Sequence, residues 1–282
     1  MLVDKPAGVT SHDVVQQVRR RVGIRAAGHT GTLDPFATGL LVVLIGSATR
    51  LARFVEAQSK TYLATAQLGV RTTTDDLTGA VVDTAIGMPP EPSVREALAG
   101  FVGLQLQQPP QYSAKRVAGE RSYRKARRGE RVELADVSVT VHWIELLKYA
   151  PPELTFRAAV SAGTYIRAIA RDLGDRLGVG AHLSGLRREA VGSLRVEDAV
   201  PLEQVSPAVV LPARRVLGDL PGFDLDDAAR NDVIHGRAVV DCRESGKRES
   251  GEVVALLGDG QLVAVARAED GWLRPTVVLE VR

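Results

Sequence analysis

The chain reads Gly28-His29-Thr30-Gly31-Thr32-Leu33-Asp34-Pro35-Phe36-Ala37-Thr38-Gly39 and continues into six apolar residues, Leu40 to Ile45. A short apolar run bounded by turn residues indicates a buried strand. Glycines on both sides of Asp34 let the backbone fold tightly and let a large ligand approach, and the bond to Pro35 restricts the end of the loop. The stretch therefore predicts a loop that presents one carboxylate from a rigid base, although Asp before Pro is also a common turn former.

Hydrophobic periodicity on either side of this loop predicts the neighbouring elements. Thr10 followed by Asp13 is a capping-box pattern, and valines at helical spacing follow it, which predicts a helix over residues 11–21. Ser47 is expected to cap a second helix, and a polar turn is expected at residues 72–79. The remaining patterns predict helices at residues 93–98 and 164–177 and strands at residues 2–3, 62–70, 137–147 and 154–161.

Length and composition predict one large domain followed by a smaller one. The chain has 282 residues, and 45% hydrophobic with 25% charged residues is ordinary globular composition. After Leu211-Pro212 the pattern changes to short strands, at residues 253–257, 262–266 and 277–281, which indicates a small β domain. Residues 1–218 carry a net charge of +7 and residues 219–282 a net charge of −5, although the whole chain is only +2.

A basic segment at about residues 107–131 interrupts the alternation of helices and strands. Eight basic residues and two acidic ones lie between Tyr112 and Arg131. Any one of the basic residues could be a solvated surface charge, but their density favours an exposed insertion that contacts nucleic-acid phosphates.

Several classes of protein lose their usual sequence signatures. The chain has no GxxxxGK[ST], no GxGxxG and no HExxH motif, and its five histidines are scattered. The single cysteine, Cys242, can form neither an internal disulfide nor a cysteine-rich zinc site, which favours a reducing cytoplasm. The longest apolar run has six residues, against about 20 for a membrane span, and no basic-then-apolar leader opens the chain. A Ser-His-Asp triad stays open, although no GxSxG motif indicates one.

Four ordered motifs resemble those of the TruB family, the bacterial tRNA pseudouridine-55 synthases. Besides residues 28–39 they are Asp4-Lys5-Pro6-Ala7-Gly8 with Ser11-His12-Asp13, Lys60-Thr61-Tyr62, and Gly163-Thr164-Tyr165-Ile166-Arg167; Leu186-Arg187-Arg188 also has the family's form. The resemblance covers about residues 1–195, and residues 271–275 extend it more weakly. It implies an α+β fold with a pseudouridine-synthase-like mixed, largely antiparallel sheet flanked by helices (residues 1–218), followed by a small PUA-like β domain (residues 219–282).

The resemblance also implies the reaction. A uridine at position 55, in the TΨC loop of tRNA, is flipped out of its stack and isomerised to pseudouridine by cleavage and re-formation of its glycosidic bond. Nothing is oxidised, so we expect no metal and no cofactor. We further expect a cytoplasmic monomer that binds the tRNA TΨC stem-loop without a membrane or an obligatory protein partner. Three routes stay open: Asp34 attacks C1′, adds to C6, or assists elimination through a glycal.

The family's roles carry over to matching residues. Asp34 is implied to be the nucleophile or its electrostatic equivalent, Arg167 its ionic partner, and Tyr62 the aromatic residue that stacks on the base and serves proton transfer. An arginine within about 4–6 Å would lower the pKa of Asp34 and offset the effect of burial. On residue type alone, Arg167 would be an exposed helix charge and Tyr62 a core aromatic.

The implied contacts with RNA are of two kinds. His29, Tyr165, Leu186 and Lys5 match substrate-binding positions, and His29 would enter the space that the flipped uridine leaves. The basic segment matches the family's thumb, in which the RNA backbone would be contacted by Lys115, Arg116, Arg124, Lys125, Arg127 and Arg128.

Two other interpretations compete with this one. An RNA chaperone that flips and refolds the arm of the tRNA would use the same residues except Asp34. A glycoside-type hydrolase would pair Asp34 with another carboxylate and release free uracil.

Overall fold

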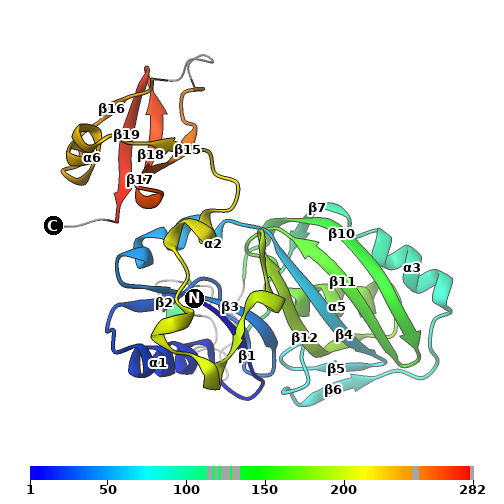
Figure 1. The fold of residues 1–282 in the computed structure, drawn as a ribbon. Helices are drawn as coiled ribbons and strands as arrows, with labels where there is room; N and C mark the ends of the chain where they lie inside the picture. Colours follow the sequence, from blue (N-terminus) through cyan, green and yellow to red (C-terminus); the bar gives the residue numbers. More distant parts are fainter. Residues whose placement is uncertain (113–115, 118–119, 122–127, 129–133, 243–247, 280–282) are drawn as a thin grey trace.

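The computed structural model describes residues 1–282 except 113–115, 118–119, 122–127, 129–133, 243–247 and 280–282. Two sheets dominate it (Figure 1): a large one that includes β1, β3, β4 and β10 to β12, and a small one near the C-terminus with β15 to β19. No helix in the described part of the chain is long and apolar enough to cross a membrane.

The large sheet has ten strands, of which eight follow the order β14-β1-β3-β12-β4-β11-β10-β7, while β2 pairs with β3 and β13 with β12. All of its pairs are antiparallel except β1 with β14 and β3 with β12. The expected mixed, largely antiparallel sheet is therefore confirmed. Its strands are β1 (Leu2–Lys5), β2 (Ala27–His29), β3 (Thr38–Ile45), β4 (Lys60–Leu68), β7 (Gly103–Gln107), β10 (Val137–Ala150), β11 (Glu153–Val160), β12 (Ala181–Val191), β13 (Leu194–Arg195) and β14 (Val200–Pro201).

Strand β12 lies at the centre of the sheet and was not predicted as a strand. Its middle reads Leu186-Arg187-Arg188-Glu189, which has no alternation of apolar and polar residues. The Arg188 side chain is nevertheless buried, with its guanidinium donating to the carbonyl oxygens of Leu40 and Gly31 at 2.7 and 3.1 Å. A buried arginine whose hydrogen bonds are satisfied thus hides the strand pattern.

The predicted helices are present with small changes at their ends. They are α1 (Ser11–Val22), α2 (Ala52–Glu56), α3 (Glu91–Ala99) and α5 (Ile166–Arg176), and a further helix that was not predicted, α6 (Asp227–Ile234), lies in the C-terminal part. The capping box of Thr10 and Asp13 at α1 is confirmed. The expectation that Ser47 caps a helix is wrong: Ser47 lies inside a 3-10 helix, η1 (Gly46–Leu51), whose N-cap is Ile45.

The two halves of the large sheet are covered by different helices. Helix α1 packs Val14, Val15 and Val18 against β1, β2 and β3. Helix α5 packs Ile169 and Leu173 into the core next to β4, β11 and β12. Burial alternates along β4, so that Lys60, Tyr62, Ala64, Ala66 and Leu68 share one buried face. Tyr62 therefore lies in the core cluster that also holds α5.

A hairpin and a 3-10 helix complete the frame of the large sheet. The hairpin pairs β5 (Val70–Thr72) with β6 (Val81–Thr84), and the predicted polar turn at residues 72–79 forms its loop. The 3-10 helix η5 (Ala213–Leu217) contacts both α2 and β18. Two short strands, β8 (Arg116–Val117) and β9 (Glu120–Arg121), pair within the basic segment.

The small sheet has the order β15-β17-β18-β19-β16. Its strands are β15 (Gly222–Asp224), β16 (Val239–Val240), β17 (Val253–Gly258), β18 (Gln261–Glu269) and β19 (Trp272–Val278). The expected C-terminal β domain is confirmed, but the strand predicted at 277–281 instead begins at Trp272, because Pro275 is accommodated at an irregularity where β18 pairs with β19. One apolar cluster joins the two sheets, with Leu40 and Val42 on one side and Ala255 and Val265 on the other.

Candidate active site

A cavity of about 700 Å³ opens where the Asp34 loop, the β5–β6 loop and the start of α5 meet. Strands β4 and β12 supply another part of its wall. Its walls include Asp34, Tyr62, Asp76, Tyr165, Arg167 and Leu186. Segments far apart in the sequence therefore converge on the loop that the sequence singled out.

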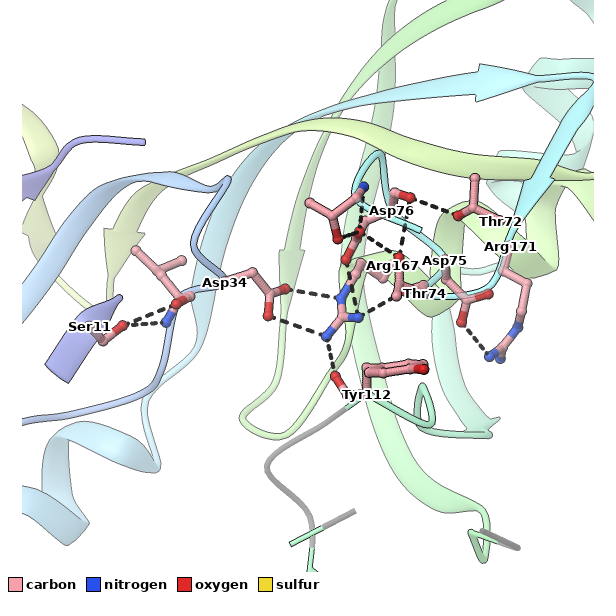
Figure 2. A network of polar contacts seen from close by, with 11 residues as sticks. Ser11, Asp34, Thr72, Thr74, Asp75, Asp76, Tyr112, Arg167 and Arg171 are labelled. Atoms are coloured by element: carbon pink, nitrogen blue, oxygen red, sulfur yellow. Dashed lines mark hydrogen bonds and ion pairs between the residues drawn. The ribbon is translucent and has the colours of Figure 1, made fainter. Parts of the chain in front are cut away.

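The Asp34 loop is anchored to the first turn of α1. The Ser11 hydroxyl accepts a hydrogen bond from the Leu33 N–H at 2.9 Å and can donate to the Leu33 carbonyl at 3.1 Å. Both partners are buried, and Figure 2 shows the pair directly beside Asp34. Ser11 thus fixes the residue before the carboxylate, a role that its place in the Ser11-His12-Asp13 motif did not reveal.

The other end of the loop is held by Gly39, where β3 meets β12. Gly39 has φ +100°, and a Cβ there would lie 2.3 Å from the Arg188 carbonyl oxygen. Only glycine therefore permits this close parallel approach of the two strands. The approach sets β12, with Leu186 and Arg188, against the Asp34 loop.

Arg167 meets Asp34 inside the cavity, as the family resemblance implies (Figure 2). The Arg167 Nε lies 3.0 Å from Asp34 Oδ2, and Nη2 donates to Oδ1 at 3.3 Å. The Arg167 side chain is only 5% exposed and that of Asp34 is 32% exposed, so the carboxylate faces the open space and the guanidinium is behind it. An exposed helix charge, the interpretation from residue type alone, is wrong for Arg167.

Three further acceptors fix the guanidinium. Nη1 donates to the Thr74 carbonyl at 2.9 Å and lies 3.3 Å from Asp76 Oδ2, while Nη2 also donates to the Tyr112 carbonyl at 2.8 Å. Because these acceptors lie on several sides of the guanidinium, they fix its orientation, and in that orientation it faces Asp34.

Asp76 was missed by sequence analysis. Its Oδ1 accepts hydrogen bonds from the Thr74 hydroxyl at 2.7 Å and from the Thr78 N–H at 2.9 Å, and its Oδ2 faces Arg167. The side chain is 6% exposed. The local signal, threonines two residues before and after an aspartate, is equally typical of an ordinary polar turn. Only the fold brings this turn to Arg167.

Burial is the largest influence on the pKa of Asp34. Desolvation raises the pKa of Asp34, Arg167 lowers it, and the negative charge of Asp76 raises it again. The net direction is upward. Arg167 therefore offsets the effect of burial only in part, because burial together with the charge of Asp76 outweighs it.

A second arginine–carboxylate pair lies behind the first. Arg171, one turn after Arg167 on α5, lies 3.2 Å from Asp75, which occupies the left-handed region at φ +59°. Burial raises the pKa of Asp75 against the lowering effect of Arg171. The two neighbouring aspartates thus bind two arginines on one helix, which joins the β5–β6 loop to α5.

The aromatic and apolar candidates line the cavity around this network. Tyr62 is 9% exposed and comes from β4, and Leu186 comes from β12. Tyr165 is the N-cap residue of α5 rather than part of its helical stripe, because its backbone is extended. These side chains could form the flat, dry walls that a nucleobase requires.

Lys5 and His29 do not belong to the cavity wall. Lys5 is fully buried, and its ammonium donates to the carbonyl oxygens of Pro6, Val9 and Pro35 at 2.9, 2.8 and 3.3 Å. Burial lowers the pKa of Lys5 to about 8, although Asp34 raises it. Lys5 therefore supports the loop from beneath. His29 is half-buried at the end of β2.

The basic segment is described only in part. Arg116 is in β8, and Arg128 is exposed in a turn. Lys115, Arg124, Lys125 and Arg127 lie outside the described residues. In the described part of the chain, no group of three or more His, Cys, Asp or Glu side chains is placed to hold a metal ion.

Comparison with known proteins assigns this chain to a class, the pseudouridylate synthases. The family model "TruB family pseudouridylate synthase (N terminal domain)" matches residues 19–166, and "tRNA pseudouridylate synthase B C-terminal domain" matches residues 167–219. Within that class, the chain belongs to the TruB family.

Relatives along the whole chain agree with this assignment. The tRNA pseudouridine synthase B of Thermobifida fusca (strain YX) is 42% identical over 289 residues, which cover 99% of this chain and 97% of the relative. That of Burkholderia pseudomallei (strain 668) is 41% identical over 285 residues, 98% of this chain and 94% of the relative. Among solved structures, a chain of an H/ACA RNP bound to a substrate RNA containing 2'-deoxyuridine has a TM-score of 0.75 at 25% identity, over 100% of this chain and 85% of that one.

Proposed function

We propose that the protein isomerises the uridine at position 55, in the TΨC loop of tRNA, to pseudouridine. The observation that supports this most directly is the Asp34–Arg167 ion pair in the wall of a cavity of about 700 Å³, with Tyr62 and Tyr165 in the same wall. The relatives, which are tRNA pseudouridine synthases, agree with the proposal.

The chemistry requires an ionised carboxylate next to an extruded nucleotide. The bond between N1 of uracil and C1′ breaks, the base turns, and C5 bonds to C1′; C5 then loses its proton and N1 gains one, so the composition is unchanged. Asp34 supplies the negative charge, and the raised direction of its pKa makes it a stronger base and nucleophile than an ordinary aspartate. Attack at C1′, addition to C6 and elimination through a glycal all begin from this carboxylate.

The other residues hold the base and the arginine. We assign Tyr62 to stacking and proton transfer, and Tyr165 and Leu186 to the walls against the base. Arg167 keeps Asp34 oriented, since two of its nitrogens lie at the two carboxylate oxygens. Lys5 acts through the loop that it supports, and His29 fills the gap in the RNA after flipping.

The rest of the chain serves RNA binding. We propose that residues 1–218 form the catalytic domain, that the basic segment at about 107–131 grips the backbone of the TΨC stem-loop, and that residues 219–282 form a PUA-like domain. We also propose that the protein is a monomer, because one chain contains every residue assigned above, and that it acts in the cytoplasm.

The test is pseudouridine formation in an unmodified tRNA transcript, mapped by carbodiimide-dependent primer extension. We expect a product at position 55 with the wild-type protein and none with Asp34→Asn, which should bind tRNA nearly as well. Asp83→Asn, an exposed aspartate on β6, is the matched control and should be fully active. Turnover by Asp34→Asn within about tenfold of wild type would remove Asp34 from the chemistry.

The same assay separates the competing functions. Free uracil in the supernatant would indicate a hydrolase, and refolding of the tRNA by Asp34→Asn without any product would indicate a chaperone.

A further inference from the structure

Gln107 lies where β7 ends, and its side chain contacts the N-terminus of the helix that contains Arg167. The Gln107 Oε1 accepts a hydrogen bond from the Tyr165 N–H at 2.8 Å, and Nε2 donates to the Tyr165 carbonyl at 3.1 Å. Gln107 is 4% exposed. One buried amide thus satisfies both backbone groups of a single residue, as a neighbouring strand would.

Tyr165 lies at the start of α5, where backbone N–H groups have no partner within the helix. As the N-cap of α5, Tyr165 makes no capping hydrogen bond with its own side chain, whereas Ser, Thr, Asp or Asn at that position usually would. Its carbonyl already accepts the first helical bond, from Ile169 N–H at 3.2 Å. The amide of Gln107 therefore binds the backbone N–H of the N-cap residue itself, as the side chain at N3 does in a capping box, and it does so from a strand that is 58 residues away in the sequence.

The segment after Gln107 reinforces the same contact. The Gln108 carbonyl accepts from Arg171 Nη2 at 2.9 Å, and the Tyr112 carbonyl accepts from Arg167 Nη2 at 2.8 Å. Residues 107–112 therefore meet α5 at its N-cap, at Arg167 and one turn further. Within residues 107–112, Gln107 contributes its side chain to these contacts, whereas Gln108 and Tyr112 contribute backbone carbonyls, so the Gln107 contact can be removed by substitution without changing Arg167 or Arg171.

We propose that Gln107 is a positioning residue for the uridine site: its amide fixes the backbone of Tyr165 and the first turn of α5, so that the Tyr165 ring and Arg167 meet the base and Asp34 in register. The inference rests on the proposed function and adds to it a residue that does not line the cavity. It requires an amide, since a carboxylate could accept from the Tyr165 N–H but would repel the Tyr165 carbonyl.

The test compares Gln107→Ala and Gln107→Glu with the matched control pair Gln105→Ala and Gln105→Glu. Gln105 is two residues earlier on β7 and, like Gln107, lies beside Asp172 and Arg176 of α5, but its side chain accepts a hydrogen bond from Arg176 Nη2, at 3.4 Å, near the other end of the helix. The measurement is the single-turnover rate constant of pseudouridine formation at saturating enzyme. That constant reports chemistry at each folded site, so partial unfolding does not imitate the effect.

For Gln107→Ala we expect a rate constant about 100-fold lower than wild type, as for a reacting group displaced by about 1 Å. For Gln107→Glu, which keeps the size of the side chain, we expect about a tenfold loss at pH 8. The ratio of Gln107→Glu to Gln105→Glu should rise as the pH falls, because a protonated glutamic acid recovers the missing donor. Affinity for tRNA should stay within about threefold of wild type in all four variants.

A wild-type rate constant for Gln107→Glu would overturn the inference, because side-chain volume alone would then suffice. So would variants whose melting temperature falls while their rate constants stay at the wild-type value. If the wild-type protein itself makes no pseudouridine, the proposed function fails instead, and the two failures are distinguishable in the same experiment.

Discussion

The guanidinium of Arg167 lies between the carboxylates of Asp34 and Asp76, so one positive charge is shared by two negative charges. A single arginine cannot stabilise the charge of both Asp34 and Asp76 fully, and burial raises the pKa of Asp34 further. Asp34 therefore remains basic for an aspartate while its orientation is fixed. A free salt bridge on the surface would give neither property.

The acid side of the pH–rate profile should report this competition. In the wild type, the rate should fall as the pH decreases through the raised pKa of Asp34, above the ordinary value for aspartate. Asp76→Asn removes a negative charge that raises this pKa, so the acid limb should move to lower pH. The maximal rate should fall by about 10- to 100-fold because Arg167 loses an acceptor.

Asp75→Asn is the matched control for this shift, since Asp75 pairs with Arg171 and is not among the groups that shift the pKa of Asp34. Its acid limb should coincide with that of the wild type. An Asp76→Asn profile whose limb does not move would contradict the assigned coupling of the two carboxylates.

The raised pKa also predicts a cost in stability. Because the folded state holds the Asp34 proton more tightly than the unfolded chain, ionisation of Asp34 lowers the free energy of unfolding as the pH rises through the raised pKa. Asp34→Asn removes that cost. Its melting temperature should exceed that of the wild type at pH 8, and the difference should vanish below the ordinary pKa of aspartate. Calorimetry that finds the variant less stable at pH 8 would contradict this.

At the scale of elements, the site depends on the close parallel approach of β3 and β12. Gly39→Ala should weaken it, because the added Cβ would meet the Arg188 carbonyl oxygen at 2.3 Å and φ is +100°. Backbone strain of this kind costs about 1–3 kcal/mol, before any clash is counted. We expect a lower melting temperature together with a loss of turnover.

Gly28→Ala tests the specificity of that effect. Gly28 lies in the same loop region, on β2, and a Cβ there meets nothing within 4 Å. It should leave both stability and turnover near wild type. Equal losses in the two variants would show that the loop is sensitive to any substitution rather than to contact with β12.

Local signals made some elements predictable and left others hidden. The capping box of Thr10 and Asp13 fixes the start of α1, and the run after Gly39 is apolar enough to indicate β3. The centre of β12 contains a buried arginine, so its pattern is not that of a strand. In the site, the Asp34 loop has a distinctive sequence, whereas Asp76 and Gln107 act through partners 91 and 58 residues away, for which no local pattern exists.

At the scale of the whole molecule, the two ends of the chain have opposite charge but share one apolar core. Residues 1–218 carry +7 and residues 219–282 carry −5. The 3-10 helix η5 lies between α2 and β18, and its Val216 and Leu217 belong to the cluster that joins the sheets. The acidic sheet is therefore attached to the basic part through apolar contacts, and the positive charge that RNA binding would use is concentrated before residue 219.

Charge reversal in the basic segment should weaken tRNA binding and should also make that binding less dependent on salt. For Arg127→Glu with Arg128→Glu, we expect the slope of log Kd against log salt to be less steep by about one to two. Arg237→Glu, in the acidic part and paired with Asp232, is the control and should leave the slope unchanged. The measurement is fluorescence anisotropy with labelled tRNA between low and moderate salt. An unchanged slope in the double variant would remove the phosphate contacts.

Arg167 lies 133 residues after Asp34 in the chain, and this distance has a consequence during translation. The loop with the reactive carboxylate leaves the ribosome long before the helix that orients it, and the two turns that hold the guanidinium emerge in between. Until that helix is released, the nascent polypeptide has Asp34 without its ionic partner and lacks the part of the cavity wall that Tyr165 and Arg167 form. The Asp34–Arg167 pair can therefore form only after residue 167 has been released, and all activity that depends on this pair must wait for that point of synthesis.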